Sequence, residues 1–223
     1  MESQRQAQIH VAPDPEAYLG LVPLHDGSAG GTDDILGEVN PDTEASLNSM
    51  NYVDLDDKGH MYVDISDNPN DGEGVNSDST TWFKRMFKIC NNGKADATVM
   101  IDVADLNFHP SSTDGIDATG EPIVDVYVGD DDDFGNYDPE ASLLVDSEDP
   151  SWVDPQDSDA GVNIDVGECK VVHMRTSTKS INAKETFGDE APEGFETGDR
   201  VPLVWGTATV TADAPGASQP GES

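Results

Sequence analysis

The densest group of side chains that could bind a metal ion is the acidic run between Gly129 and Glu140. Clustered carboxylates on a loop are ligands that a hard cation such as Ca²⁺ selects. The candidate ligands are Asp130, Asp131, Asp132, Asp133 and Asp138. The run departs from the EF-hand template, because Phe134 stands at its fifth position and Ala141 at its closing position. Two interpretations stay open: a site for Ca²⁺ or another cation, or a solvated acidic loop.

No short motif in the sequence indicates an enzyme. The five histidines are scattered and form neither HExxH nor another short metal-ligand spacing. A GxSxG nucleophile elbow, a Walker loop and a dinucleotide-binding fingerprint are all absent from the sequence. Paired carboxylates are uninformative, because among 46 acidic residues two will be close by chance. We expect a protein that is not an enzyme, and a secreted hydrolase with an unrecognised site stays as a third interpretation.

The chain contains two cysteines, Cys90 and Cys169. They form no CxxC motif and lie near no histidine cluster, which argues against a thiolate metal site. In an extracellular protein they would most simply pair as a disulfide. Closing a loop of about 80 residues contributes roughly 4 to 5 kcal/mol in the chain-entropy model. The alternative is two separately buried thiols.

Net charge is the dominant feature of the composition. The chain carries 46 acidic and 11 basic residues, which gives a formal charge of −35 at pH 7. The Debye length falls from about 10 Å at 0.1 M salt to about 3 Å at 1 M, so this repulsion becomes tolerable at very high salt. We expect a halophilic protein that binds neither nucleic acid nor anionic membrane. Intrinsic disorder is the alternative, but acidic and apolar residues alternate here in strand patterns.

The sole basic cluster consists of Lys84, Arg85 and Lys88, and aromatic residues flank it. On so acidic a protein, such a cluster could dock the acidic surface of a neighbouring molecule. The alternative is local charge balance at the start of a strand.

Apolar residues recur with a period of two, as in β-strands, rather than with the helical period of 3.6. Strands are predicted at residues 4–11, 18–22, 60–65, 86–90, 97–103, 123–128, 142–145, 162–174 and 201–212. The turn Asn91-Asn92-Gly93 between two alternating runs predicts a β-hairpin. No segment is a convincing amphipathic helix of ten residues. The sequence therefore predicts an all-β fold, in detail a jelly-roll β-sandwich with long acidic loops.

The N-terminal strand is the most suggestive element for function. Polar residues at even positions alternate there with Ala7, Ile9 and Val11, and a Pro-x-Pro break follows at once. Such a segment could leave its own sheet and add to a neighbour's edge, as in donor-strand pili. A head-to-tail contact that does not close on itself gives a filament. The alternative is that residues 4–12 pair within their own subunit.

Three segments resemble a family of exported haloarchaeal proteins that carry a domain of unknown function. They are Arg5 and Ile9-His10-Val11-Ala12 with Ala17-Tyr18-Leu19-Gly20-Leu21, Gly74-Val75-Asn76 with Phe87-Lys88-Ile89-Cys90-Asn91-Asn92-Gly93, and Gly206-Thr207-Ala208-Thr209-Val210-Thr211-Ala212. The similarity covers most of the chain through short motifs in a shared order. That family is similar in turn to the TasA and camelysin group and to archaeal bundling-pilus subunits. Those are exported jelly-roll proteins that polymerise through N-terminal donor strands.

The resemblance implies a structural filament or pilus subunit of a halophile, located outside the cell or on its surface. The partner would be the chain itself in a head-to-tail homopolymer, with other cells or surfaces as further partners. The donor-strand residues would be Arg5, Ala7, Ile9 and Val11, inserted into a groove of the adjacent subunit. The acidic run and the cysteine pair have no place in the family pattern. The runner-up hypothesis is a monomeric secreted or cell-surface binding module, dependent on a cation, whose N-terminal strand closes its own sheet.

The predicted organisation is one large β-domain with an extension at each end. Residues 1–13 are the donor strand, 14–213 the jelly-roll domain with an acidic insertion at 129–160, and 214–223 a loose tail. No stretch approaches the roughly 20 apolar residues of a membrane span. The first residues are polar and do not resemble a signal peptide, so an exported protein would be in its mature form.

Overall fold

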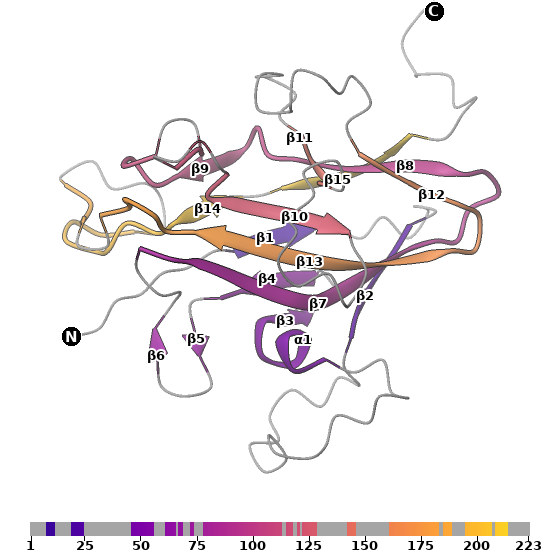
Figure 1. The fold of residues 1–223 in the computed structure, drawn as a ribbon, viewed down its shortest axis with the longest axis horizontal. Coiled ribbons are helices and arrows are strands. Elements are labelled where there is room, and N and C mark those ends of the chain that lie inside the picture. The colour runs from indigo at the N-terminus through magenta and orange to yellow at the C-terminus, as the bar shows by residue number, and fades with distance from the viewer. Residues whose placement is uncertain are drawn as a thin grey trace, which may run out of the picture.

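The computed structural model is all-β, with one short helix among the residues it describes (Figure 1). The described residues are 8–11, 19–24, 46–55, 61–65, 67–68, 72–73, 78–112, 115–117, 120, 122–128, 142–145, 161–182, 185–188, 195–206 and 208–213. The all-β class predicted from the period of two is confirmed. Several predicted features lie outside this set: Arg5, Ala7, Asp130, Asp131, Asp132, Asp133, Asp138 and the tail 214–223.

The strands are mostly short. In the first half of the chain the elements are β1 (Gln8–Val11), β2 (Leu19–Pro23), α1 (Leu47–Tyr52), β3 (Val53–Leu55), β4 (Met61–Asp64), β5 (Asp67–Asn68), β6 (Gly72–Glu73), β7 (Thr80–Asn91) and β8 (Ala97–Asp102). In the second half they are β9 (Leu106–Phe108), β10 (Val124–Val128), β11 (Leu144–Val145), β12 (Val162–Ile164), β13 (Cys169–Ser177), β14 (Val204–Gly206) and β15 (Thr209–Asp213). Two strands are long, because β7 has 12 residues and β13 has 9.

The long strands β7 and β13 form the centre of a four-stranded antiparallel sheet. Their ladder runs from Ser177 opposite Thr80 to Cys169 opposite Cys90. On the other edges, β10 pairs with β13 and β2 pairs with β7, which gives the order β10-β13-β7-β2. A bulge interrupts the central ladder near Arg85, whose φ is 55°. In Figure 1 this sheet is the layer nearer the viewer.

Two smaller sheets lie behind this layer. In the first, β4 lies between β1 and β3, and both pairs are antiparallel. In the second, β15 runs antiparallel along one edge of β8, while β12 and the parallel β11 divide its other edge. Two further pairs, β14 with β9 and β5 with β6, complete the described ladders.

The hydrophobic core lies between the front sheet and the two back sheets. Side chains along β4 and β8 alternate between buried and half-buried, as a period of two predicts. Phe87 and Val126 of the front sheet meet Met61 of β4 and Ile101 of β8 around one small cavity. Each fully buried apolar side chain of this size contributes about 1.5–3 kcal/mol. The contact between the layers is therefore the main favourable term in folding.

The turn Asn91-Asn92-Gly93 does not form the predicted hairpin. The strands on either side of it, β7 and β8, belong to different sheets, so the turn carries the chain from the front layer to the back. The buried Asn91 side chain explains this difference. Its amide donates to the carbonyls of Ala95 and Ile164, and its oxygen accepts from the Gly93 N–H. Because these groups are satisfied inside the turn, an arch between layers replaces a ladder between neighbours.

Two predicted strands are each split in the structure. Residues 162–174 are divided between β12 and β13, and residues 201–212 between β14 and β15. The second break follows Gly206, whose φ of 132° favours glycine. A Cβ at this position would lie 2.5 Å from the carbonyl oxygen of Asp105. Glycine therefore lets the chain leave β9 and enter a different sheet as β15.

A disulfide joins Cys90 to Cys169 at one end of the central ladder. The two cysteines are register partners, and their Cα atoms are 4.0 Å apart. They are 79 residues apart in the sequence, so the bond closes a loop that contains β8 to β12. The sequence left open a disulfide or two separately buried thiols, and the structure has the disulfide.

Replacing Gly206 by alanine is expected to destabilise the fold. The substitution combines an unfavourable φ with a steric clash, and we expect the free energy of unfolding to fall by about 2–4 kcal/mol. Gly198→Ala is the matched control, because Gly198 has a φ of 94° but no atom within 4 Å of a new Cβ. That variant should lose only about 1 kcal/mol. Equal losses in denaturant titrations would show that the contact with Asp105 is unimportant.

Removing the disulfide is expected to cost more than either glycine change. The double variant Cys90→Ala/Cys169→Ala gains the loop entropy of its unfolded state, which lowers the free energy of unfolding by about 4–5 kcal/mol. Denaturant unfolding in molar salt measures this loss. An unchanged unfolding midpoint would mean that the β7–β13 ladder alone holds the two strands.

Candidate functional site

The N-terminal strand β1 is an end strand of the sheet β1-β4-β3, and its free side faces two strands of other sheets. Its backbone pairs antiparallel with β4, from Gln8 opposite Asp64 to Val11 opposite Met61. Cα atoms of β14 and β15 lie within 8 Å of those of β1 (Figure 1). Sheets that face each other are about 10 Å apart, so β14 and β15 are lateral neighbours of β1. We call the gap that β1 fills, between β4 on one side and β14 and β15 on the other, the N-terminal slot.

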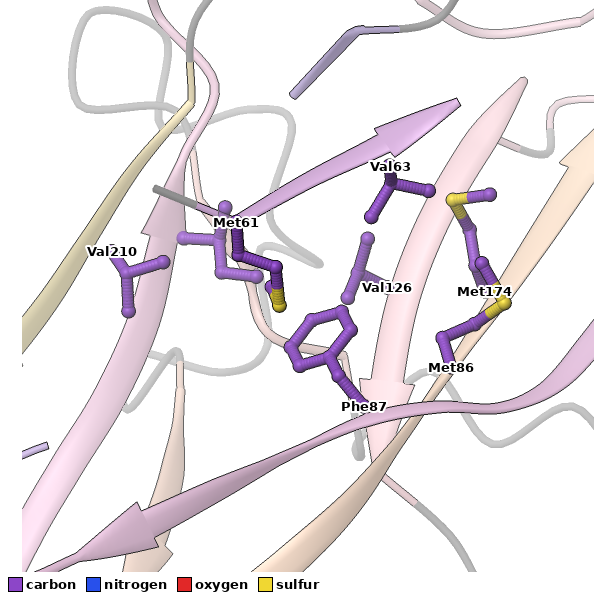
Figure 2. Close-up of a pocket in the computed structure, with 8 residues that line it drawn as sticks. Met61, Val63, Met86, Phe87, Val126, Met174 and Val210 are labelled. Carbon is purple, nitrogen blue, oxygen red and sulfur yellow. The ribbon is translucent and has the colours of Figure 1, made fainter. Parts of the chain in front are cut away.

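A small apolar cavity forms the floor of the N-terminal slot. Figure 2 shows side chains from both layers pointing toward it. Met61 and Val63 come from β4 and Val210 comes from β15, the strands on either side of β1. The other lining residues are Met86, Phe87, Ile101, Val126 and Met174. The floor is therefore built by the strands that flank β1 together with the front sheet.

The cavity is suited to apolar groups. Its volume is about 20 Å³, and all of its lining residues are apolar. A buried water molecule needs two to four polar partners, which this lining does not offer. Three of the lining residues, Met61, Met86 and Met174, carry flexible thioether chains that fill irregular gaps. The floor of the slot can therefore adapt to apolar side chains of different shapes.

Two predicted donor-strand residues align with this floor. The register places Ile9 opposite Val63 and Val11 opposite Met61. Residues directly opposite each other in an antiparallel ladder share one face of the sheet. Val63 and Met61 are only 4% and 2% exposed, so this is the core face. The register therefore places Ile9 and Val11 beside two buried residues of β4.

The attachment of β1 is short. Four residue pairs join β1 to β4, whereas eight join β13 to β7. Segments with few backbone hydrogen bonds and little buried surface open at lower free energy than the central strands of a sheet. Opening of the N-terminal slot is therefore expected to precede unfolding of the β7–β13 ladder.

The acidic run proposed as a Ca²⁺ site lies outside the described residues. The described ranges hold no group of three or more His, Cys, Asp or Glu side chains that could bind a metal ion. Two buried histidines have backbone partners: Nδ1 of His109 accepts from the Ser111 N–H, and Nδ1 of His173 accepts from the Arg85 N–H. These bonds tie both rings to neighbouring backbone. Among the described residues, no helix is long and apolar enough to cross a membrane.

A buried polar group on the front sheet was missed by sequence reasoning. Asp125 lies opposite Arg175 in the β10–β13 ladder, and the two are 1% and 2% exposed. Asp125 accepts a 2.6 Å hydrogen bond from Ser142 Oγ, and the Arg175 guanidinium lies 5.4 Å from the centre of the Trp82 ring. The sequence signal is the polar residue between Val124 and Val126, but alternation alone predicts a solvent-facing side chain there.

Comparison of the chain with protein-family models, with curated proteins and with solved structures finds no match. The N-terminal slot is the most distinctive feature of the described geometry, because it has an apolar floor and holds a short strand that pairs with β4 alone.

The cavity makes a specific prediction about packing. Val126→Ile adds one methylene beside the cavity and should change the free energy of unfolding by less than about 1 kcal/mol. Val124→Ile is the matched control: Val124 lies on the same strand and is equally buried, at 3%, but does not line the cavity. There the extra methylene is not next to this cavity, and it should cost about 1–3 kcal/mol. Denaturant unfolding of both variants tests this, and the reverse order would contradict the placement of the cavity.

Proposed function

We propose that this chain is the structural subunit of an extracellular filament or pilus, assembled by donor-strand complementation. The observation that carries the proposal is the position of β1: a short strand pairs with β4 and lies beside β14 and β15, over an apolar floor. A neighbour's residues 4–12 would enter the same slot, with Arg5, Ala7, Ile9 and Val11 as the inserted residues. The chain would thus be its own partner in a head-to-tail homopolymer.

Exchange of β1 between subunits would keep the interactions that β1 makes. A neighbour's β1 has the same sequence, so it can form the same ladder with β4 and cover the same floor. Exchange then replaces each interaction of β1 with an identical one, so the free energy of assembly comes from additional interactions between subunits and from protein concentration. Each subunit gives one strand and receives one, so the contact is heterologous. When its rotation does not close a ring, such a contact yields a filament.

The proposed fold in detail is a jelly-roll β-sandwich. Support comes from the two layers around one core, and from the Asn91 turn that crosses between them. The proposed domain division is unchanged: a donor strand at 1–13, a sandwich at 14–213 with the acidic insertion 129–160, and a tail at 214–223.

The proposed location, outside a halophilic cell, rests on charge and on the disulfide. A bond such as Cys90–Cys169 persists in oxidising compartments and is rare in a reducing cytosol. The formal charge of −35 makes subunits repel, and high salt reduces that repulsion to a few ångströms. An inserted apolar strand does not depend on charge, so it is a suitable joint between such subunits.

The second candidate function is a monomeric secreted or cell-surface binding module. The ladder between β1 and β4 of the same chain favours it, because that strand closes its own sheet. Ca²⁺ at the acidic run near Asp130 would be its cation. The two candidates differ in one respect that can be measured: whether β1 leaves the slot.

A disulfide staple tests this difference. His10 and Tyr62 are directly opposite in the β1–β4 ladder. Opposite Cα atoms in such ladders are about 4.5–5.5 Å apart, inside the range that a disulfide bridges. Oxidised His10→Cys/Tyr62→Cys holds β1 in its own slot, and we call this variant the locked chain. We expect wild-type protein to form filaments in molar salt by electron microscopy, and the locked chain to form none.

The single variants His10→Cys and Tyr62→Cys are the controls, oxidised in the same way. Reduction of the locked chain cannot serve as the control, because a reductant would also cut the bond between Cys90 and Cys169. Both single variants should polymerise. Filaments from the locked chain would rule out strand exchange, and a wild-type protein that stays monomeric would favour the binding module.

A further inference from the structure

The exposed large apolar side chains gather in one part of the described structure. Five such residues are exposed there, and four of them lie on β2, α1 and β3. They are Val22, Leu47, Met50 and Leu55, with exposed fractions of 45%, 40%, 42% and 46%. The fifth, Val166, lies in the turn between β12 and β13. We call Val22, Leu47 and Met50, with Leu55 beside them on the following strand, the α1 patch.

Hydrogen bonds hold α1 against the end of β2. The Ser46 N–H donates to the Leu24 carbonyl, and the Leu24 N–H donates to Ser49 Oγ at 2.7 Å. These bonds bring Val22, two residues before Leu24, close to the start of the helix. Leu47 and Met50 are three residues apart in α1 and therefore share a helix face. Hydrogen bonds therefore fix the backbone segments that carry these apolar side chains.

The helix is also fixed against the front sheet. The side-chain amide of Asn48 donates to the Lys84 carbonyl at 2.8 Å. The rings of Tyr52 and Phe83 pack edge to face, 5.2 Å between centres. Burial raises the pKa of the Tyr52 phenol, because it disfavours the charged form. One face of the short helix is therefore occupied by the protein, and Leu47 and Met50 stand on the other.

The α1 patch adjoins two sheet edges. In the described ladders, β2 is the last strand of the front sheet and β3 the last strand of its back sheet. An apolar patch between two such edges is suited to another protein surface rather than to a small polar ligand.

The basic cluster and the net charge of the chain favour a second copy of the chain as the partner. The basic cluster of Lys84, Arg85 and Lys88 belongs to β7, and Lys88 lies directly opposite the exposed Val22. It holds three of the 11 basic residues of a chain with formal charge −35. A second copy presents a mostly acidic surface, and complementary charge orients two such molecules. Docking to the acidic surface of a neighbouring molecule is one of the two roles that the sequence suggested for this cluster.

We propose that the α1 patch binds a second copy of this chain, through apolar contact at Leu47 and Met50 and charge complementarity at the basic cluster. This contact needs no exchange of β1, so it goes beyond the proposed joint between subunits. High salt strengthens the contact, because it screens the long-range repulsion between the two acidic molecules, whereas apolar burial is maintained and partly buried ion pairs in close contact are screened much less. The partner is a molecule of the same kind, bound through the face that carries α1.

The locked chain allows this contact to be measured without polymerisation. Sedimentation velocity of the locked chain in molar KCl should show association that increases with protein concentration. Met50→Glu in the locked chain places a charge in the patch and should weaken association at least about tenfold. Lys88→Glu reverses the charge complementarity and should weaken it as well. Val166→Glu is the matched control, because Val166 is 49% exposed but lies outside the patch, and it should leave association unchanged.

Three results would overturn the proposal. The first is a locked chain that stays monomeric at every protein and salt concentration. The second is equal weakening by Met50→Glu and Val166→Glu. The third is association that begins only when residues 26–44 are deleted, since the chain's own segment would then be the occupant. Circular dichroism of each variant checks that it is folded, and filament formation by the unlocked chain is scored separately, so that each proposal fails independently.

Discussion

The antiparallel ladder between β7 and β13 is the interaction on which the rest of the structure depends. Both remaining strands of the front sheet pair with its outer edges, and a disulfide closes its end at Cys90 and Cys169. Its core face carries Phe87 and Met174, which meet the back layer around the cavity. Its bulge turns the Arg85 N–H toward His173. Without this ladder, neither layer of the core would have a surface to pack against.

The back layer is different in kind, because its continuity depends on the short strand β1. β4 and β15 belong to separate sheets, and β1 lies between them. An empty slot would expose two strand edges and an apolar floor to solvent, which is costly and favours aggregation. The fold therefore requires a strand at this place. Nothing in the ladder itself specifies which copy of the chain provides that strand.

Local patterns predicted much of this fold, and long-range pairing accounts for what they missed. The alternation around Ile9 and Val11 correctly placed a strand, because a period of two is the pattern of extended backbone. The hairpin predicted at Asn91 was wrong. The Asn91 side-chain amide donates a hydrogen bond to the carbonyl of Ile164, 73 residues away, and this long-range contact accompanies the change of layer. The floor of the slot could not be predicted either. Its methionines come from three distant strands, and only the folded chain brings them together.

The disulfide also has a mechanical consequence. Tension that enters the chain at β2 and leaves through β13 passes across the bond between Cys90 and Cys169. The residues between the two cysteines, which include β8 to β12, are then shielded from the load. The disulfide therefore prevents the extension of about 270 Å of chain, at roughly 3.4 Å per residue. A molecule built in this way yields outside the disulfide loop, while the segment between the two cysteines keeps its length under strain.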